Sequence, residues 1–156
     1  MNTPNFSNIL DREFEKAERP KPLPVGTYLT IIEGLPRYDK SSKKQTDFVE
    51  FTHRIVAAAD DVDADELAEV GGITLKDGTP RSIKNSYYLT EDAAWRLDKF
   101  LEDLGYDLEE AKGEGITRRQ MCEEAMNREV YIQIRHEPSQ DGRSIFARIG
   151  DTAATE

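Results

Sequence analysis

Aromatic and cationic side chains share one face in several segments that have the alternating pattern of β-strands. The clearest is Asp47–Ala59, where a period of two separates a largely apolar face from a face that carries Phe48 and Arg54. The combination recurs in three later strands, as Lys84 with Tyr88, Tyr131 with Arg135, and Phe146 with Arg148. Exposed rings stack on flat groups and neighbouring cations meet phosphates, so the pattern indicates binding rather than catalysis.

Two structural alternatives compete with that interpretation. Phe48 fits a buried core position as well as an exposed platform, and its own strand favours neither. Aromatic and arginine side chains also pair across strands and stabilise only the sheet, and an N-terminal segment that folds back would cover the rings. Because four strands repeat the combination, we favour a binding surface.

The segment between the first two expected strands is basic. Pro36–Thr46 carries one acid, Asp39, among several cations and an aromatic ring. The candidate binding residues in it are Arg37, Tyr38, Lys40, Lys43 and Lys44. In such a long basic hairpin loop the cations would contact a phosphate backbone and Tyr38 would stack on a base. The alternative is that the loop is only a solvated turn, which is the simpler interpretation of any one such loop.

The overall charge argues against a nucleic-acid partner, but its distribution weakens that argument. The 156-residue chain has a formal net charge of −10. Six acids fall in Asp60–Glu69 and six more in Glu102–Glu114, while the remainder is close to neutral and has basic clusters. Net charge therefore does not decide whether the chain binds an acidic polymer.

Few residues offer material for a catalytic or metal site. The acidic spacing in Asp61–Asp65 resembles a calcium loop, but Glu66 stands where glycine is needed and Gly72 where a bidentate glutamate is needed. His53 alternates with core residues and the single cysteine, Cys122, falls in a helical pattern, so we expect both to be buried and inert. We expect no enzyme activity, no cofactor and no metal; a nuclease that binds metals through the acidic segment is the remaining catalytic alternative.

The expected elements are three strands, then helices, then two strands. The strands are Thr27–Leu35, Asp47–Ala59, Arg81–Leu89, Arg128–Glu137 and Arg143–Ile149. Thr90 caps a helix at Glu91–Leu104, in which Trp95 lies off the apolar stripe and is expected to be half-buried. Thr117 and Gln120 form a capping box that opens a short second helix. The order predicts a mainly β, five-stranded OB-fold-like barrel with helices between strands three and four.

The domain boundaries follow from composition. Residues 1–26 are expected to form an N-terminal extension and linker, residues 27–149 the OB-fold-like domain, and residues 150–156 a short mobile tail. Asp11–Arg19 has the composition of a short charged helix, and the alternating prolines after it favour an extended tether along the domain. No segment has the roughly 18 apolar residues of a membrane helix, so we expect a soluble, cytoplasmic protein.

Four segments between residues 23 and 149 carry a resemblance to a known family. They are Leu23–Tyr28, the basic hairpin Tyr38–Lys44, the strand Phe48–Ile55 and the helix Ala94–Gly105. Together they resemble a family of phage-encoded single-stranded-DNA-binding proteins with an OB-fold, long catalogued as a phage domain of unknown function. The resemblance implies DNA replication or recombination work in the cytoplasm of a host infected by a bacteriophage. Other replication or recombination proteins would then be further partners.

The sequence thus leads to one functional hypothesis and one alternative. The hypothesis is non-enzymatic, sequence-tolerant binding of single-stranded DNA, with the aromatic side chains on bases and the cations on phosphates. The alternative is a protein-binding adaptor or virion component that uses the exposed aromatics as a protein interface. The sequence leaves the oligomeric state, the site size and the preference for DNA or RNA open.

Overall fold

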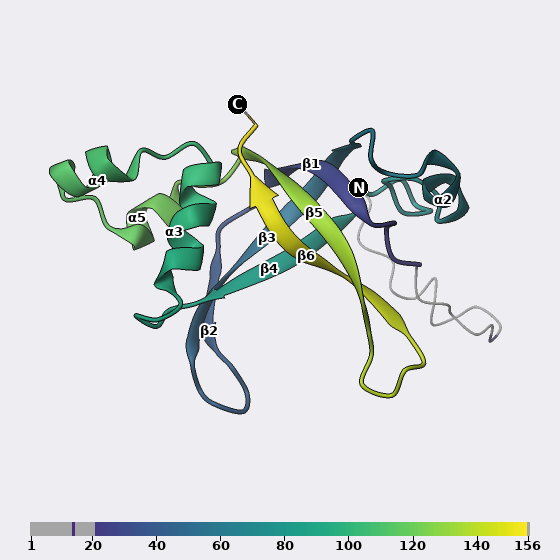
Figure 1. The fold of residues 1–156 in the computed structure, drawn as a ribbon, viewed down its shortest axis with the longest axis horizontal. Coiled ribbons are helices and arrows are strands. Elements are labelled where there is room, and N and C mark those ends of the chain that lie inside the picture. Colours follow the sequence, from purple (N-terminus) through teal and green to yellow (C-terminus); the bar gives the residue numbers. More distant parts are fainter. Residues whose placement is uncertain (1–13, 15–20, 156) are drawn as a thin grey trace, which may run out of the picture.

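A computed structural model of the chain describes Phe14 and residues 21–155, and in this part six antiparallel strands form one open sheet (Figure 1). The strands are β1 (Gly26–Ile32), β2 (Arg37–Lys40), β3 (Asp47–Ala58), β4 (Ser82–Tyr88), β5 (Glu129–Pro138) and β6 (Ile145–Ala153). The hydrogen-bonded order is β2-β3-β1-β5-β6, and β4 pairs with β3. The long strand β3 holds β1 and β2 at different stretches of its length and β4 along its centre.

Four helices flank the sheet within the described residues. They are α2 (Ala64–Glu69), α3 (Ala94–Asp103), α4 (Leu108–Glu114) and α5 (Arg118–Glu123). Figure 1 shows α3, α4 and α5 gathered at one end of the sheet and α2 at the other. Asp63 caps α2 and Thr117 forms the expected capping box with Gln120, because each side chain accepts hydrogen bonds from the otherwise unpaired first-turn N–H groups. None of these helices is long and apolar enough to cross a membrane.

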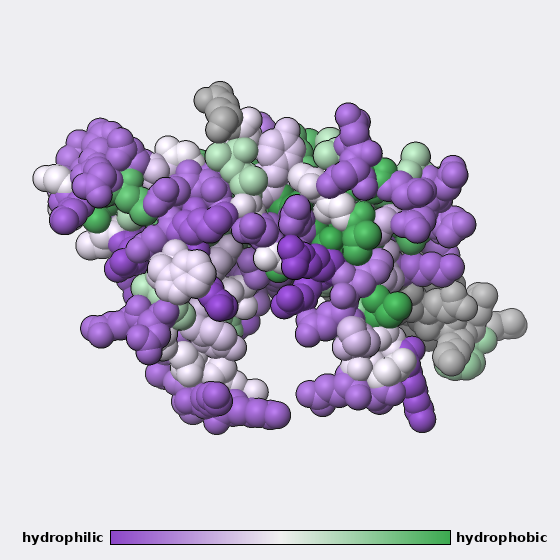
Figure 2. Space-filling model, in the orientation of Figure 1, coloured by the Kyte–Doolittle hydropathy of each residue, from purple (hydrophilic) through white to green (hydrophobic). Residues whose placement is uncertain are grey.

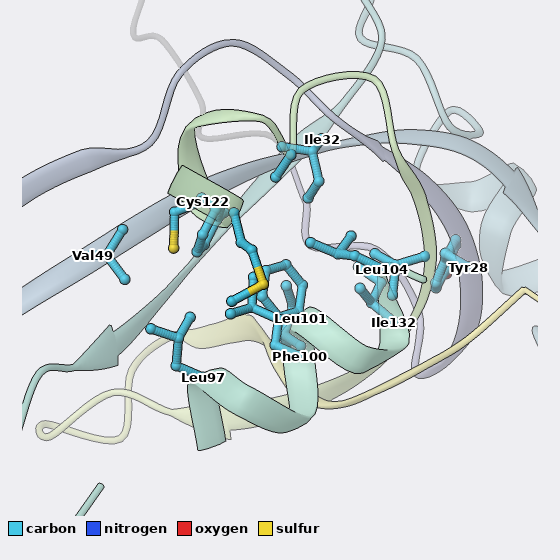
Figure 3. Close-up of a cluster of buried hydrophobic side chains, with 14 of the residues drawn as sticks. Tyr28, Ile32, Val49, Leu97, Phe100, Leu101, Leu104, Cys122 and Ile132 are labelled. Atoms are coloured by element: carbon cyan, nitrogen blue, oxygen red, sulfur yellow. The ribbon is translucent and has the colours of Figure 1, made fainter. Parts of the chain in front are cut away.

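The core lies between the inner face of the sheet and α3. Alternation on β3 buries Val49, Phe51, His53 and Ile55, as the sequence predicts. Phe100 of α3 stacks on Tyr87 with ring centroids 5.0 Å apart and contacts Phe51 at 4.9 Å. In Figure 3, leucines of α3 point toward sheet residues and toward the α5 cysteine, so one apolar stripe fastens the helices to the strands.

The structure confirms the β-rich architecture and changes several of its details. Arg37–Lys40, expected to be loop, is strand β2, so the sheet has six strands rather than five. Gly34 has a φ of 72°, and with Pro36 it separates β2 from β1. The helix expected from Glu91 begins at Ala94, after a turn, and α4 was not predicted. Strand β6 continues to Ala153, so residues 150–153 belong to the sheet rather than to a tail.

The sheet does not close into a hydrogen-bonded barrel. Strands β4 and β6 approach each other, but in the described part of the chain no ladder joins them. Each keeps one free edge, and the two edges face the same gap. We call this gap the β4–β6 seam.

The N-terminal tether lies along the domain from Lys21 onward, in agreement with the expectation for a proline-rich segment. Leu23 is buried, and its carbonyl accepts a hydrogen bond of 2.7 Å from His136. The Tyr28 hydroxyl donates to the Pro24 carbonyl over 2.7 Å. The helix expected at Asp11–Arg19 lies outside the described residues.

Candidate nucleic-acid interface

Phe48 lies on the outer face of the sheet and not in the core. Its cross-strand neighbours are Asp39 on β2 and Tyr88 on β4. The ring is half-buried, and the guanidinium group of Arg37 lies 5.2 Å from its centroid. The sequence left open whether Phe48 is a core residue or an exposed one. The structure places it on the outer face of the sheet, where the Arg37 guanidinium lies beside its ring.

Most cations on this outer face are engaged in ion pairs. Arg37 donates to Asp39 over 2.6 Å and to Glu50 over 3.1 Å. Arg54 pairs with Glu33 at 3.9 Å. On the other face of β2, Lys40 pairs with its cross-strand neighbour Asp47 at 2.8 Å. A hydrogen bond from the Lys40 amide and the charge of Arg37 both hold the pKa of Asp39 below its usual value. Lys84, exposed opposite Thr52, forms no ion pair with any described residue.

Tyr38 lies on the opposite face from Phe48. It pairs in register with Val49, whose side chain is buried, so its ring turns toward α5. The guanidinium group of Arg119 lies 4.6 Å from the Tyr38 centroid. The structure therefore does not bring Tyr38 together with the other candidate stacking residues.

The last two strands carry their candidates on the outer face of the β5–β6 hairpin. Tyr131 faces Leu29 and Ala153 across the ladder, and Phe146 faces Glu137. Arg135 and Arg148 are direct cross-strand neighbours, an arrangement of like charges that destabilises a sheet unless counter-charges are near. Arg148 has such a partner in Glu137, at 3.4 Å.

Two hairpins project from the same side of the molecule. These are the β2–β3 hairpin and the β5–β6 hairpin, both at the bottom of Figure 1. In the space-filling view of Figure 2, an open notch separates the two arms, and hydrophilic side chains cover their tips.

A hollow of about 490 Å³ lies between the β2–β3 loop and the start of α3. Its lining includes Ser41, Lys43, Lys44, Tyr88 and Thr90. Neither Lys43 nor Lys44 forms an ion pair with a described residue, and both are exposed. The hollow thus offers two available ammonium groups, several hydroxyls and one aromatic face.

A second hollow of about 480 Å³ follows the β4–β6 seam. Its lining includes Tyr88, Trp95, Arg96, Lys99, Arg148 and Asp151. Tyr88 and Ala93 line both hollows, so the two adjoin. We call the combined surface the seam groove.

The seam groove has a charge opposite to that of the whole molecule. Its lining holds five cations and one carboxylate, whereas the chain carries a net charge of −10. Lys99 is partly neutralised, since it donates to Asp103 over 2.8 Å and to Asp151 over 3.1 Å. Burial alone would lower the pKa of Lys99, but these two bonds outweigh it and raise the pKa, so the amine stays charged. With Asp103 and Glu137 included, which pair with Lys99 and Arg148 from outside the lining, five cations face three carboxylates, so the local charge stays positive.

The seam groove combines some sequence-predicted residues with others that the sequence did not single out. Lys43, Lys44, Tyr88 and Arg148 were predicted and line it. The remaining candidates lie elsewhere: Arg37, Phe48, Arg54 and Lys84 on the outer face of β2, β3 and β4, Tyr131, Arg135 and Phe146 on the β5–β6 hairpin, and Tyr38 and Lys40 on the opposite face of β2, with Tyr38 beside α5. Trp95, Arg96 and Lys99 were missed. The position of Trp95 off the apolar stripe of its helix was the available signal.

His53 and Cys122 are both buried, and burial keeps each in its neutral form. His53 is fully buried, and the Thr30 hydroxyl, 3.1 Å from its Nδ1, donates to the Val130 carbonyl. The imidazole therefore donates from Nδ1, and burial lowers its pKa to about 4. Burial likewise raises the pKa of Cys122 to about 11, which keeps the thiol protonated. No three His, Cys, Asp or Glu side chains among the described residues are placed to hold a metal ion.

Neither the models of known protein families nor the curated proteins contain a match to the chain.

Proposed function

We propose that the protein binds single-stranded DNA without strong sequence preference and without catalysis, along the seam groove. The observation that carries the proposal is the charge and composition of that groove. Cations outnumber acids five to one there, in a chain whose net charge is −10. Proteins that bind single strands without sequence preference typically have a positively charged groove with exposed aromatic rings.

The strand arrangement supports the same proposal. We propose that the sheet is an OB-fold barrel left open at the β4–β6 seam. β1 pairs with β3 and β5, β3 with β4, and β5 with β6, which follows the order expected of that fold apart from the missing last ladder. OB-folds bind oligonucleotides on their second and third strands and on the loops between strands one and two and between four and five. Here these correspond to β3, β4 and the two projecting hairpins.

The biological setting proposed from the resemblance is the cytoplasm of a host infected by a phage. There the protein would cover single strands that arise in replication or recombination. Cations that contact phosphates and aromatic rings that stack on bases do not depend on sequence, and a protein that covers single strands must accept every sequence.

A fluorescence-anisotropy titration tests the function. The labelled ligand is an oligo-dT of about 30 nucleotides, at low and at moderate salt, with a duplex of equal length as the comparison. We expect binding of the single strand that weakens with salt, and much weaker binding of the duplex. Absence of binding at low salt contradicts the proposal.

The second candidate is a protein-binding adaptor or virion component. Ile145 on the β5–β6 hairpin and Leu35 before β2 expose large apolar side chains, at 56% and 71%. Such residues suit a protein partner more than a nucleic acid. If the oligonucleotide does not bind, variants with Ile145→Ser or Leu35→Ser are the next to examine, by loss of association with candidate partner chains.

A further inference from the structure

Trp95 stands exposed in the first turn of α3, although tryptophan is on average a highly buried residue. It is the only tryptophan in the chain and is 60% exposed. The same helix buries Leu97, Phe100 and Leu101 on its other side, so packing of α3 does not depend on the indole. An exposed indole that contributes little to the core is available to a ligand.

Trp95 lies in the seam groove. It lines the same hollow as Tyr88 of β4, the element just before α3, and Arg148 of β6, which is distant in the sequence. Tyr88, 51% exposed, also lines the hollow beside the basic β2–β3 loop. Two exposed rings therefore follow one another along a single groove.

Cations accompany the indole on both sides of the groove. The Arg96 guanidinium lies 5.4 Å from the Trp95 ring centroid and pairs with no carboxylate among the described residues. Across the seam, Arg148 pairs with Glu137 at 3.4 Å, and both side chains are more than half exposed. Such surface pairs contribute little, so a phosphate can replace Glu137 at small cost.

We propose that Trp95 is a base-stacking platform and that Arg96 contacts a phosphate beside it. The bound strand then passes from the β2–β3 loop over Tyr88 to the start of α3 and to β6, and not over the outer face of β1 and β5. This inference rests on the proposed function. It adds two binding residues and a path that the alternation of the strands does not indicate.

The single tryptophan makes a direct test possible. Oligo-dT is titrated into the full-length protein while anisotropy of the labelled strand and intrinsic tryptophan emission are both recorded. We expect the emission to be quenched with the same midpoint as the anisotropy change. Trp95→Ala should weaken binding at least about fivefold, whereas Trp95→Phe, which keeps a ring, should restore most of the affinity.

Matched variants separate the inference from the function. Met126→Ala removes a comparably exposed apolar side chain outside the groove and should leave affinity unchanged. Arg96→Ala should lower the salt dependence by about 0.7 in log–log slope, and Lys112→Ala should not. If the oligonucleotide binds but wild-type emission does not change and Trp95→Ala binds normally, the path is wrong and the function stands. If no variant, wild type included, binds in the anisotropy measurement, the proposed function itself fails.

Discussion

Tyr88 occupies the position where the two hollows meet, and its contribution differs in kind from that of Phe48. Both rings lie on the outer face and are cross-strand neighbours. Tyr88 lines the seam groove, whereas Phe48 is partly covered by Arg37 and lines neither hollow. If the proposed function holds, we expect Tyr88 to stack directly on a base and Phe48 to contribute less, as its neighbour on the adjacent strand.

Alanine substitutions separate these two contributions. Tyr88→Ala should weaken oligo-dT binding by about 1–3 kcal/mol, the range for loss of one stacked base, with little change in stability. Phe48→Ala should weaken binding less and destabilise the domain by about 1 kcal/mol, because the contacts with Tyr88 and Arg37 are lost. Anisotropy titration and urea unfolding of each variant provide the two measurements. Unfolding of Phe48→Ala with normal residual affinity would mean that the ring belongs to the core.

The tip of the β2–β3 hairpin carries positive charge that no carboxylate of the described residues neutralises. Lys43 and Lys44 are exposed at its tip and line the hollow beside Tyr88. The double variant Lys43→Ala/Lys44→Ala should weaken binding at low salt and reduce the log–log salt slope by about 1.4, since each phosphate contact on a single strand contributes about 0.7. The measurement is affinity at three or more salt concentrations.

Lys112 provides the control for the Lys43→Ala/Lys44→Ala variant. Lys112→Ala, on α4 and outside both hollows, changes the net charge without touching the groove and should leave the slope unchanged. An equal loss of affinity in this variant and in the hairpin variant would show that binding follows overall charge and not the hairpin.

A substitution on the outer face of β5 tests the proposed path of the bound strand along the seam groove. Tyr131 was among the candidate stacking residues, but it lies between Leu29 and Ala153 on the outer face and lines neither hollow. Tyr131→Leu keeps an apolar side chain on the strand and should bind oligo-dT within about twofold of the wild type. A loss as large as that of Tyr88→Ala would place the strand over β5 instead of the seam.

The sequence predicted the strands and helices better than it predicted which of their side chains come together in the folded chain. A period of two identified the buried face of β3, and the capping box at Thr117 identified the start of α5, because both signals are local. Tyr38 was expected to stack from a loop because Arg37–Lys40 was not expected to be a strand; its register opposite Val49 places it on the other face of β2, beside Arg119 of α5. The approach of Trp95 to β6 depends on tertiary packing of α3, which no local pattern encodes.

Of the two acidic segments, Asp60–Glu69 supplies no residue to the lining of the seam groove, whereas Asp103 of the second segment pairs with Lys99 in it. The cluster at Asp60–Glu69 has structural tasks: Asp61 accepts two hydrogen bonds of 2.8 Å from Thr27, and Asp63 caps α2. None of the acids of that cluster lines either hollow. We therefore expect the charge close to the groove, rather than the net charge of the chain, to govern the proposed binding at moderate salt, where charges more than about 10 Å apart are largely screened.

The pH dependence of stability follows from the buried imidazole of His53. Its pKa is about 4 in the folded state because burial disfavours the charged form, while the ordinary value is 6.5. Between these two values only the unfolded chain binds the proton, so stability falls as pH decreases from 6.5 toward 4. The expected loss between about pH 7 and about pH 5 is roughly 2 kcal/mol.

Replacing His53 with glutamine should remove this dependence. Gln has no titration in the range, and its amide can donate to Thr30, so His53→Gln lowers stability at pH 7 by a constant amount and flattens the curve. The measurement is urea unfolding of both proteins at several pH values, compared by the difference in free energy between pH 7 and pH 5, which cancels the constant offset. Parallel curves for the two proteins would show that His53 is protonated as easily in the folded state as in the unfolded one. The imidazole would then be open to water, and the inner face of β3 would not be the sealed core on which the outward placement of the binding residues depends.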